Sequence, residues 1–332
     1  MFLILLALQV LTTVPRADPF AFFQPTVTVT ADDRRQLDRG EAIARVLPGD
    51  DPEVAVVAAV PVNIDGDRLV AWIRRIEELK KSAYVLAIRR FSNPPRIEDL
   101  AELVLDDREL SDIRACRPGH CGLNVSPAEA AELSGRGSAD AIQQAFRLIV
   151  LQRARAYLAD GHKETFARDA SPPADLSELV HHSLFLTEHM PRFANNLGHA
   201  RHTPEPGVES FLYWSKERLS GKAIVGVTEV NILYSGEPGF PEVLVAGKEF
   251  FATHYIRASL GLTMLMQGEP GRGNYLVYVN RSEVDVLGGM FGGIVRWFME
   301  RRLRTEAADV LQGLRRRLES GEPPLAVATG SP

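Results

Sequence analysis

The sequence predicts an α+β fold, in which strands and helices occupy separate stretches of the chain. Two regions of the 332-residue chain, 25–90 and 208–287, carry apolar runs and alternating patterns that favour strands. The region between them is mostly helical, and residues 290–319 have the pattern of one long amphipathic helix. Hydrophobic residues make up 45% and charged residues 24% of the chain, which is typical of a globular protein.

The chain begins with a short apolar segment, residues 2–14, which is followed by Pro15-Arg16-Ala17. A membrane-spanning helix needs about 20 apolar residues, so this segment is short for one. It has the length of a signal-peptide core, with cleavage after Ala17. We therefore expect residues 1–17 to direct export and the protein to be periplasmic. Retention of residues 2–14 as a membrane anchor, or their burial as an N-terminal element, are the alternatives.

The two cysteines, Cys116 and Cys121, point to the same compartment. They enclose four residues that include the turn dipeptide Pro118-Gly119, which can bring the sulfur atoms together. In an oxidising compartment such a pair forms a structural disulfide. Free thiols are one alternative. A metal site is another, although zinc sites usually have two residues between paired cysteines and a second ligand pair.

The first β-rich region opens with alternating residues 27–30 and a candidate strand at 41–46. Residues 54–62 are an almost unbroken apolar run, as expected of a well-buried strand. Asp65-Gly66-Asp67 then marks a turn and a helix start, because apolar residues follow at helical spacing over 69–79.

The region 91–205 is expected to be mostly helical. Ser138 can cap a helix over 139–160. Asp175 and Glu178 have the spacing of a capping box before a further helix, which Pro191 is expected to end.

The second β-rich region returns to strands at 211–218 and 222–234. Residues 243–266 are too long for one strand, and we expect them to be bent or bulged near 259–261. Residues 274–286 are expected to form the last strand.

The predicted C-terminal helix has an apolar stripe and a basic character, with seven Arg against four acidic residues over 294–319. A solvated face explains this charge, and peripheral contact with anionic membrane lipids is the alternative. The whole chain has a net charge of −5, so it lacks the basic footprint of a nucleic-acid-binding protein. Residues 321–332 are expected to be a disordered tail.

Two passages of the chain carry a resemblance to a known fold. Residues 57–62 lead from a strand into the helix at 68–73, and residues 275–279 lead from a strand into the last helix at 289–294. In this order, both passages are similar to those of START and Bet v 1-like proteins, the helix-grip superfamily that includes polyketide cyclases and aromatases.

The resemblance implies a curved antiparallel sheet around the long C-terminal helix, with a largely apolar cavity between them that holds lipids, sterols or aromatic polyketides. Residues 18–320 would then form one START-like domain. The mostly helical region at about 91–205 departs from the family, and we interpret it as an insertion. A cavity lined by apolar side chains and a few polar groups favours apolar ligands and orients them.

Lys248 and His254 are the strongest candidates for polar contacts with such a ligand. If one register holds along their segment, both share a face with Leu244, Phe250 and Leu260. A buried Lys needs an acidic neighbour, a bound anion or a depressed pKa, and an anionic amphiphile such as a fatty acid would supply the counter-charge. A bulge that turns both side chains to water is the alternative.

Three further residues complete the candidate ligand-binding set. Arg281 can bind a carboxylate or phosphate with two hydrogen bonds, or it belongs to a surface ion-pair cluster with Glu283 and Asp285. Tyr278 and Trp214 can contact a ligand or serve as core residues. Glu249, beside Lys248 in the chain, is instead expected to be solvated.

No catalytic constellation is recognised. Nucleophile, phosphate-loop and dinucleotide-binding motifs are absent, so we expect no cofactor. His182 and His189 are too far apart on their predicted helix to share a metal ion, and no HExxH motif is present, so we expect no metal site.

Three functions are consistent with these observations. We favour an exported carrier or sensor of an apolar or amphiphilic small molecule, because no catalytic residues are visible. A cyclase-like enzyme on the same scaffold is the second, and it needs an acid or base within the cavity. The third is a structural or interaction protein whose interior is filled by its own side chains.

Overall fold

The computed structural model describes most of residues 18–321. Within that range it leaves out residue 51 and the ranges 118–119, 161–175, 199–205, 220, 269–272 and 286–306. The predicted leader, the predicted tail and the Pro118-Gly119 turn therefore lie outside the described residues. The rest of the chain forms an α+β fold, as the sequence predicts.

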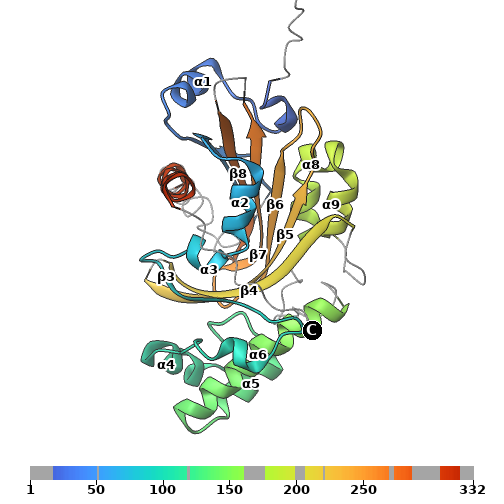
Figure 1. Ribbon diagram of the computed structural model, residues 1–332. Helices are drawn as coiled ribbons and strands as arrows, with labels where there is room; N and C mark the ends of the chain where they lie inside the picture. The colour runs from blue at the N-terminus through green and yellow to red at the C-terminus, as the bar shows by residue number, and fades with distance from the viewer. Residues whose placement is uncertain are drawn as a thin grey trace, which may run out of the picture.

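One antiparallel sheet of eight strands forms the centre of the described structure (Figure 1). The strands lie in the order β1 (Ile43–Leu47), β2 (Glu53–Val62), β8 (Asn274–Val284), β7 (Ile256–Gln267), β6 (Val243–Ala252), β5 (Lys222–Tyr234), β4 (Val208–Leu219) and β3 (Val85–Arg90). The two β-rich regions meet where β2 pairs with β8. The prediction that both regions contribute to one sheet is confirmed.

Side chains alternate along the strands, so the sheet presents two faces, and each face has its own hydrophobic cluster. We call the first the α2 face, because α2 (Gly66–Ile73) and α3 (Ile76–Leu79) pack on it. Val60 and Ile232 of the sheet belong to this smaller cluster. Asp65 caps α2 by accepting a hydrogen bond from the backbone of Arg68, as the sequence predicts for this helix start.

The opposite side of the sheet, which we call the α7 face, carries the larger cluster, with Leu262 and Val277 among its members. Every helix of the middle region contributes to this cluster. The helices are α4 (Asp107–Ala115), α5 (Pro127–Ser134), α6 (Ala139–Asp160), α7 (Leu176–His181), α8 (Leu184–His189) and α9 (Pro191–Gly198), and α1 (Ala31–Asp38) joins them from the N-terminal part. In Figure 1, α4, α5 and α6 lie together at the end of the molecule beyond β4.

The chain leaves the sheet after β3 and returns to it at β4, the neighbouring strand. All the helices from α4 to α9 lie in this excursion. Such a topology is the one that an insertion between two adjacent strands would produce, and the division of the chain into one domain with an insertion stays a prediction.

The long C-terminal helix predicted over 290–319 is not shown. Residues 307–320 are helical, and Leu311 and Leu318 pack on the α2 face. Residues 290–306 lie outside the described residues, so the described helix is short. Most of the Arg residues behind the predicted membrane contact belong to that part, and the contact stays a prediction.

Helix boundaries in the middle region follow the capping signals only in part. α6 spans the predicted range, and the hydroxyl group of Ser138 accepts a hydrogen bond of 3.2 Å from the backbone of Ala141. The helix predicted after Asp175 is divided into α7 and α8, and α8 ends at His189, directly before Pro191, as predicted. Pro191 then begins α9, because a proline fits the first turn of a helix, where its missing N–H has no partner to lose.

The segment 243–266 forms the hairpin of β6 and β7, not one bent strand. The chain reverses at residues 253–255, where Tyr255 has a φ of 63°, in the left-handed region that non-glycine residues rarely adopt. No Gly or Pro marks this turn, so the sequence pattern points to 259–261 instead. Residues 27–30 also form no strand, because Thr30 caps α1.

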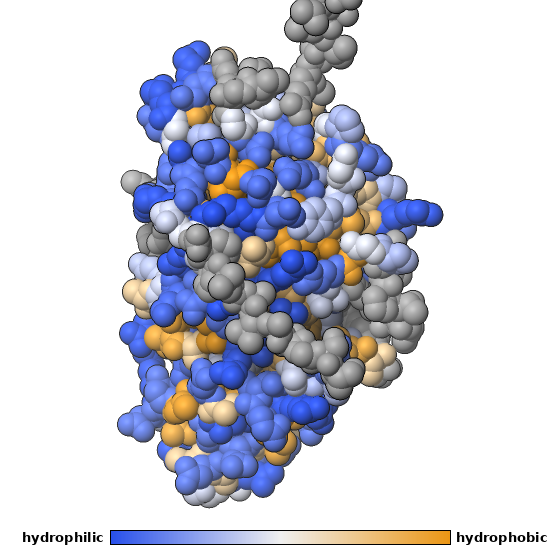
Figure 2. Space-filling view, viewed as in Figure 1, coloured by the Kyte–Doolittle hydropathy of each residue, from blue (hydrophilic) through white to orange (hydrophobic). Residues whose placement is uncertain are grey.

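Hydrophilic residues cover most of the side of the molecule seen in Figure 2, with separate groups of hydrophobic residues between them. The large hydrophobic residues that are exposed come from several elements and are Tyr84, Leu86, Ile97, Val104, Leu148, Leu158, Leu184, Leu219, Tyr234 and Val310. Scattered exposure of this kind is normal for globular proteins and does not by itself indicate an interaction surface.

Candidate functional site

The α2 face is mostly apolar at one end of the strands β4 to β8 and mostly polar at the other, although Glu209 of β4 lies at the apolar end, where it pairs with Arg74. At one end lie Phe211, Ile232, Val243, Leu265 and Leu276. Toward the other end lie Ser215, Glu217, Thr228, Glu249, Ser259, Asn280 and Ser282. We call this second part the polar end of the α2 face. Tyr278 lies in the row of Val245 and Ile232, and its hydroxyl group reaches over Gly261 toward this end.

Strand register places the side chains of the polar end in a row. Thr228 of β5 pairs with Tyr213 of β4 on one side and with Glu249 of β6 on the other. Glu249 pairs in turn with Ser259 of β7. Since directly paired side chains on neighbouring strands are about 5 Å apart, the row forms a continuous polar strip across the sheet.

Glycines give the larger side chains of the polar end room to lie close to the sheet. A Cβ atom at Gly226 would collide with Oε1 of Glu249. A Cβ atom at Gly261 would lie 3.2 Å from the hydroxyl oxygen of Tyr278. The Glu249 carboxyl group and the Tyr278 ring therefore occupy space above the backbone that any other residue at these positions would fill.

Lys80, which directly follows α3, supplies the cation of the polar end. Its Nζ atom lies 2.6 Å from Oε1 of Glu217 and donates a hydrogen bond of 3.3 Å to the hydroxyl oxygen of Tyr213. The hydroxyl group of Ser215 donates to the same Glu217 oxygen at 2.7 Å. The side chains of Lys80 and Glu217 are 31% and 36% exposed, so solvent reaches this pair.

The pair stays ionised at neutral pH. Burial lowers the pKa of Lys80, but the neighbouring Tyr213 and Glu217 side chains outweigh it and hold that pKa above its usual value. Burial raises the pKa of Glu217, but the Lys80 ammonium group outweighs it and holds that pKa below its usual value. The polar end therefore has one cation and one anion that compensate each other.

Glu249 adds a second carboxyl group, which has no cation of its own. It is half-buried, and no residue in the described part of the chain donates a hydrogen bond to it. Burial and the nearby Glu217 carboxylate raise the pKa of Glu249 to about 7, against the attraction of the Lys80 ammonium group. This carboxyl group is therefore close to half protonated at neutral pH.

Tyr278 faces the same space from β8. Burial raises the pKa of Tyr278 to about 12, so its hydroxyl group keeps its proton at neutral pH and can donate a hydrogen bond. Taken together, the polar end can accept a proton or a hydrogen bond at Glu249 and donate one from Tyr278. These two side chains are the groups of the polar end that a ligand could contact.

Lys248 lies on the other side of the sheet. It shares a face with Phe250, as the strand parity predicts, but this is the α7 face and not the one that receives residues 307–320. Its Nζ atom is 2.8 Å from Oε2 of Glu229 and donates a hydrogen bond of 3.2 Å to the backbone carbonyl of Leu197 in α9. Of the three alternatives for a buried Lys, the structure shows the acidic neighbour. The predicted position between the sheet and the C-terminal helix is wrong, because α9 covers this face.

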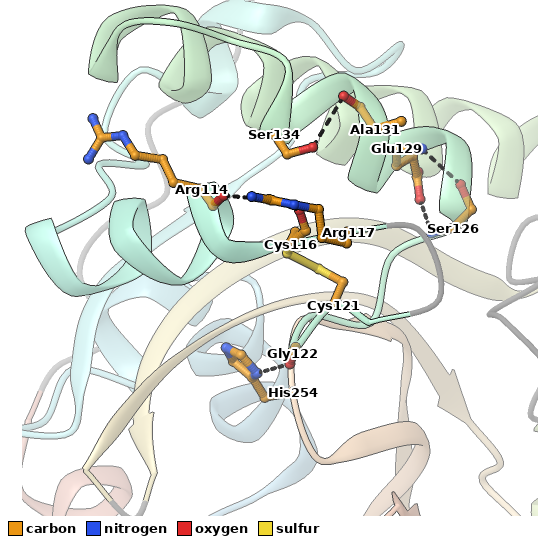
Figure 3. Close-up of a disulfide and its surroundings, with 10 residues drawn as sticks. All are labelled: Arg114, Cys116, Arg117, Cys121, Gly122, Ser126, Glu129, Ala131, Ser134 and His254. Atoms are coloured by element: carbon orange, nitrogen blue, oxygen red, sulfur yellow. Dashed lines mark hydrogen bonds between the residues drawn. A yellow bond between two sulfur atoms is a disulfide. The ribbon is translucent and has the colours of Figure 1, made fainter.

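His254 lies in the turn between β6 and β7 and not on a sheet face, so the predicted parity is wrong for this residue. Figure 3 shows its ring pointing toward Gly122, whose backbone carbonyl lies 2.8 Å from Nδ1. Its side chain therefore connects the hairpin turn with the loop that follows Cys121.

Arg281 and Trp214 also lie on the α7 face with protein partners. Arg281 is buried against Glu53 of β2, which in turn lies 2.5 Å from Nδ1 of His182. Trp214 is completely buried, and its indole N–H donates a hydrogen bond of 2.9 Å to the carbonyl of Asp99. Of the five predicted ligand-binding residues, Tyr278 is the one at the polar end.

Cys116 and Cys121 are joined by a disulfide, with their Cα atoms 4.3 Å apart (Figure 3). The predicted bond is confirmed, and it is compatible with an exported protein. It lies between α4 and α5 in the chain, and Cys116 packs in the cluster of the α7 face.

Sequence reasoning missed Lys80, Tyr213, Glu217 and Glu249. Glu249, which is expected from the sequence to be solvated, is partly buried. A usable signal was present, because Gly226, Gly247 and Gly261 all have the parity of Glu249 and its neighbours on the other strands. Glycines clustered on one face of a sheet indicate that another side chain or a ligand lies close to the backbone there.

In the part of the chain that the structure describes, no three His, Cys, Asp or Glu side chains are placed to share a metal ion. No helix among the same residues has both the length and the apolar character that crossing a membrane requires.

The sequence matches no protein-family model and no curated protein. Solved structures are similar at low levels. The protein TTHA0849 from Thermus thermophilus is 15% identical over 44% of this chain and 90% of its own, with a TM-score of 0.26. The di-domain ARO/CYC protein BexL from the BE-7585A biosynthetic pathway is 12% identical over 84% and 76%, with a TM-score of 0.24.

The di-domain ARO/CYC protein StfQ from the steffimycin biosynthetic pathway is 11% identical over 92% of this chain and 94% of its own, with a TM-score of 0.25. Likeness at these TM-scores carries no argument about the fold or the function of this chain.

Proposed function

We propose that the protein binds an amphiphilic small molecule on the α2 face of the sheet, with the polar group of the ligand at Glu249. The observation that carries this proposal is the Glu249 carboxyl group, which is half-buried beside a completed ion pair and accepts no hydrogen bond from the described residues. The Glu249 oxygens are not among the fully buried polar atoms without partners, so they are open to a ligand that donates a hydrogen bond to them.

The change from polar to apolar side chains along the α2 face supports an amphiphilic ligand over a purely polar one. From Glu249, the α2 face of β6 continues through Gly247 to Val245 and Val243, and the last two are buried in the apolar cluster. Val243 and Val245 are themselves covered, so the apolar part of a ligand at Glu249 would extend this cluster toward the polar end.

The resemblance to helix-grip proteins points to the same face. It implies a ligand between the sheet and the C-terminal helix, and residues 307–320 pack on the α2 face. We further propose that the protein is exported to the periplasm. The disulfide and the apolar leader support this localisation.

A second candidate, a cyclase-like enzyme on the same scaffold, is favoured by one specific observation. The pKa of Glu249 is raised to about 7, and a general acid or base works best when its pKa lies near the pH of the reaction. Tyr278 would then be the hydrogen-bond donor to an oxygen on the substrate. An enzyme of this kind needs an acid or base within the site, and Glu249 would meet that requirement.

Native mass spectrometry of protein purified from its host, followed by organic extraction, tests the proposed function. We expect the wild type to carry a small molecule and Glu249→Gln to carry much less of it. Glu237→Gln is the matched control, since it removes a carboxyl group from an exposed turn, and it should carry as much as the wild type. Equal loading of all three proteins would contradict a site at Glu249.

Incubation of the extracted molecule with fresh protein then separates the two candidates. A carrier returns the compound unchanged. An enzyme converts it to a product of different mass or retention time, and the conversion slows in Glu249→Gln.

A further inference from the structure

We propose that the polar group of the ligand is a protonated amine, which pairs with the Glu249 carboxylate and displaces a proton from it on binding. The inference rests on the proposed function and names the chemical class that the site accepts. It differs from the expectation drawn from Lys248, which favoured an anionic amphiphile.

The charges of the polar end favour a cation. Lys80 and Glu217 compensate each other at 2.6 Å, so the ionised Glu249 leaves this group of three with one negative charge in excess. An amine brings the matching positive charge and the N–H donors that the carboxyl group lacks. Ionic hydrogen bonds of this kind are shorter and stronger than neutral ones.

An anionic ligand is disfavoured by the same geometry. The Lys80 ammonium group already contacts Glu217 and the hydroxyl oxygen of Tyr213. An incoming carboxylate would therefore meet two carboxyl groups and one cation that is already paired. A neutral alcohol could donate a hydrogen bond to Glu249, but it would leave the excess charge uncompensated.

The aromatic side chains of the polar end are compatible with a cation. Lys80 Nζ lies 5.2 Å from the centre of the Tyr213 ring, so one ammonium group is already accommodated against this ring. Tyr278 offers a second ring from β8. The electron-rich faces of aromatic rings attract cations.

Two arginines of the helix that packs on this face are engaged elsewhere. Arg315 pairs with Glu319 on the same helix, at 3.2 Å. Arg317 donates hydrogen bonds to the backbone carbonyls of Glu78 and Leu79 in α3. The charged groups that act on Glu249 are thus Glu217 of β4 and Lys80 after α3.

Proton release follows from the protonation state of the ligand-free protein. With a pKa of about 7, Glu249 holds its proton in most molecules at pH 6 and has lost it in most molecules at pH 8. A bound cation stabilises the carboxylate and lowers this pKa. Binding at pH 6 therefore releases about one proton, and the affinity rises about tenfold from pH 6 to pH 8. Glu217, Lys80 and Tyr278 titrate outside this interval, because their pKa values are shifted away from neutrality.

Isothermal titration calorimetry with octylamine, octanol and octanoate tests the inference, because these probes share one chain length and differ in head-group charge. We expect octylamine to bind at least about tenfold more tightly than the other two at pH 8. At pH 6, its binding heat should depend on the ionisation enthalpy of the buffer with a slope of about one released proton, and octanol should show no such slope.

Two variants test whether Glu249 is the group that binds the amine and releases the proton. Glu249→Gln should bind octylamine and octanol equally and release no proton, whereas Glu237→Gln should behave as the wild type. The number of released protons is measured with the wild-type protein alone, so it tests whether octylamine binding releases a proton even if Glu249→Gln fails to fold. Tighter binding of octanoate, or equal binding of all three probes without proton release, overturns the amine inference and leaves the proposed function standing. Binding of none of the three overturns both.

Discussion

The carboxyl group of Glu249 occupies the space that a side chain at Gly226 would need. A Cβ atom built on Gly226 of β5 would collide with Oε1 of Glu249 on β6. The absence of a side chain on one strand therefore determines where an acidic group on the next strand can lie. A substitution at Gly226 should therefore displace the carboxyl group of Glu249 while Glu249 itself is retained.

We expect Gly226→Ala to lower the free energy of unfolding by about 1–3 kcal/mol, the range found for overpacked sites, because the added methyl group displaces Glu249. Urea denaturation measures this. Gly247→Ala is the matched control on β6, where a Cβ atom would meet no atom closer than 3.6 Å, and we expect it to change stability by less than about 1 kcal/mol. In a Glu249→Ala background, Gly226→Ala should cost little. An undiminished cost there would show that Glu249 is not what the methyl group meets.

The stability of the wild type should depend on pH through Glu249. Its pKa of about 7 in the folded protein lies above the usual value of 4.5, so the folded state holds this proton more tightly than the unfolded chain does. The resulting stabilisation is complete below about pH 4.5 and is lost as the pH rises through 7. We expect the free energy of unfolding of the ligand-free wild type to fall between pH 4.5 and 8, relative to Glu249→Gln, by on the order of 2 kcal/mol.

Urea denaturation of both proteins at several pH values, with Glu237→Gln as the control, tests this expectation. The difference between wild type and Glu249→Gln should change with pH, whereas the difference between wild type and Glu237→Gln should not. Parallel pH profiles of the wild type and Glu249→Gln would show that the pKa of Glu249 is not raised.

The parts of the fold that local signals determine could be predicted from the sequence. β5 matches its predicted range because an apolar run is bounded by turn residues, and α6 matches because Ser138 caps it. The turn of the β6–β7 hairpin could not be predicted. Tyr255 adopts a left-handed conformation there although it is not a glycine. His254 contacts the backbone of Gly122, which is far from it in the sequence. Conformations that depend on such distant contacts leave no local pattern.

The candidate site shows the same limit. Parity correctly places Lys248 with Phe250 and separates it from Glu249. It does not tell which of the two faces receives the middle helices and which receives residues 307–320. That choice depends on which helices pack on each face, through contacts between residues far apart in the sequence.

Lys248 should matter for stability and not for the charge preference of the ligand. It is 1% exposed, and Lys248→Met would leave the Glu229 carboxyl group buried without its cation. We expect a loss of about 3–5 kcal/mol in the free energy of unfolding. Lys248→Met with Glu229→Gln should recover most of it, because Gln removes the buried charge and can still accept the hydrogen bond from Tyr157. Urea denaturation gives both values, and an uncorrected loss in the double variant would mean that packing, not charge, explains the effect.

The disulfide should stabilise the fold modestly and leave the ligand site unchanged. Four residues separate Cys116 and Cys121, and closing so short a loop restricts the unfolded chain little, so the bond contributes about 2 kcal/mol. We expect reductant, or Cys116→Ser with Cys121→Ser, to lower the free energy of unfolding by this amount. Octylamine affinity should stay at the wild-type value, since Cys116 packs in the cluster of the α7 face and Glu249 lies on the α2 face. The double serine variant should not respond to reductant, and a thiol assay on the unfolded wild type confirms that the bond was present. If reduction weakened octylamine binding as much as Glu249→Gln does, the two regions would be coupled and the site would not be confined to the α2 face.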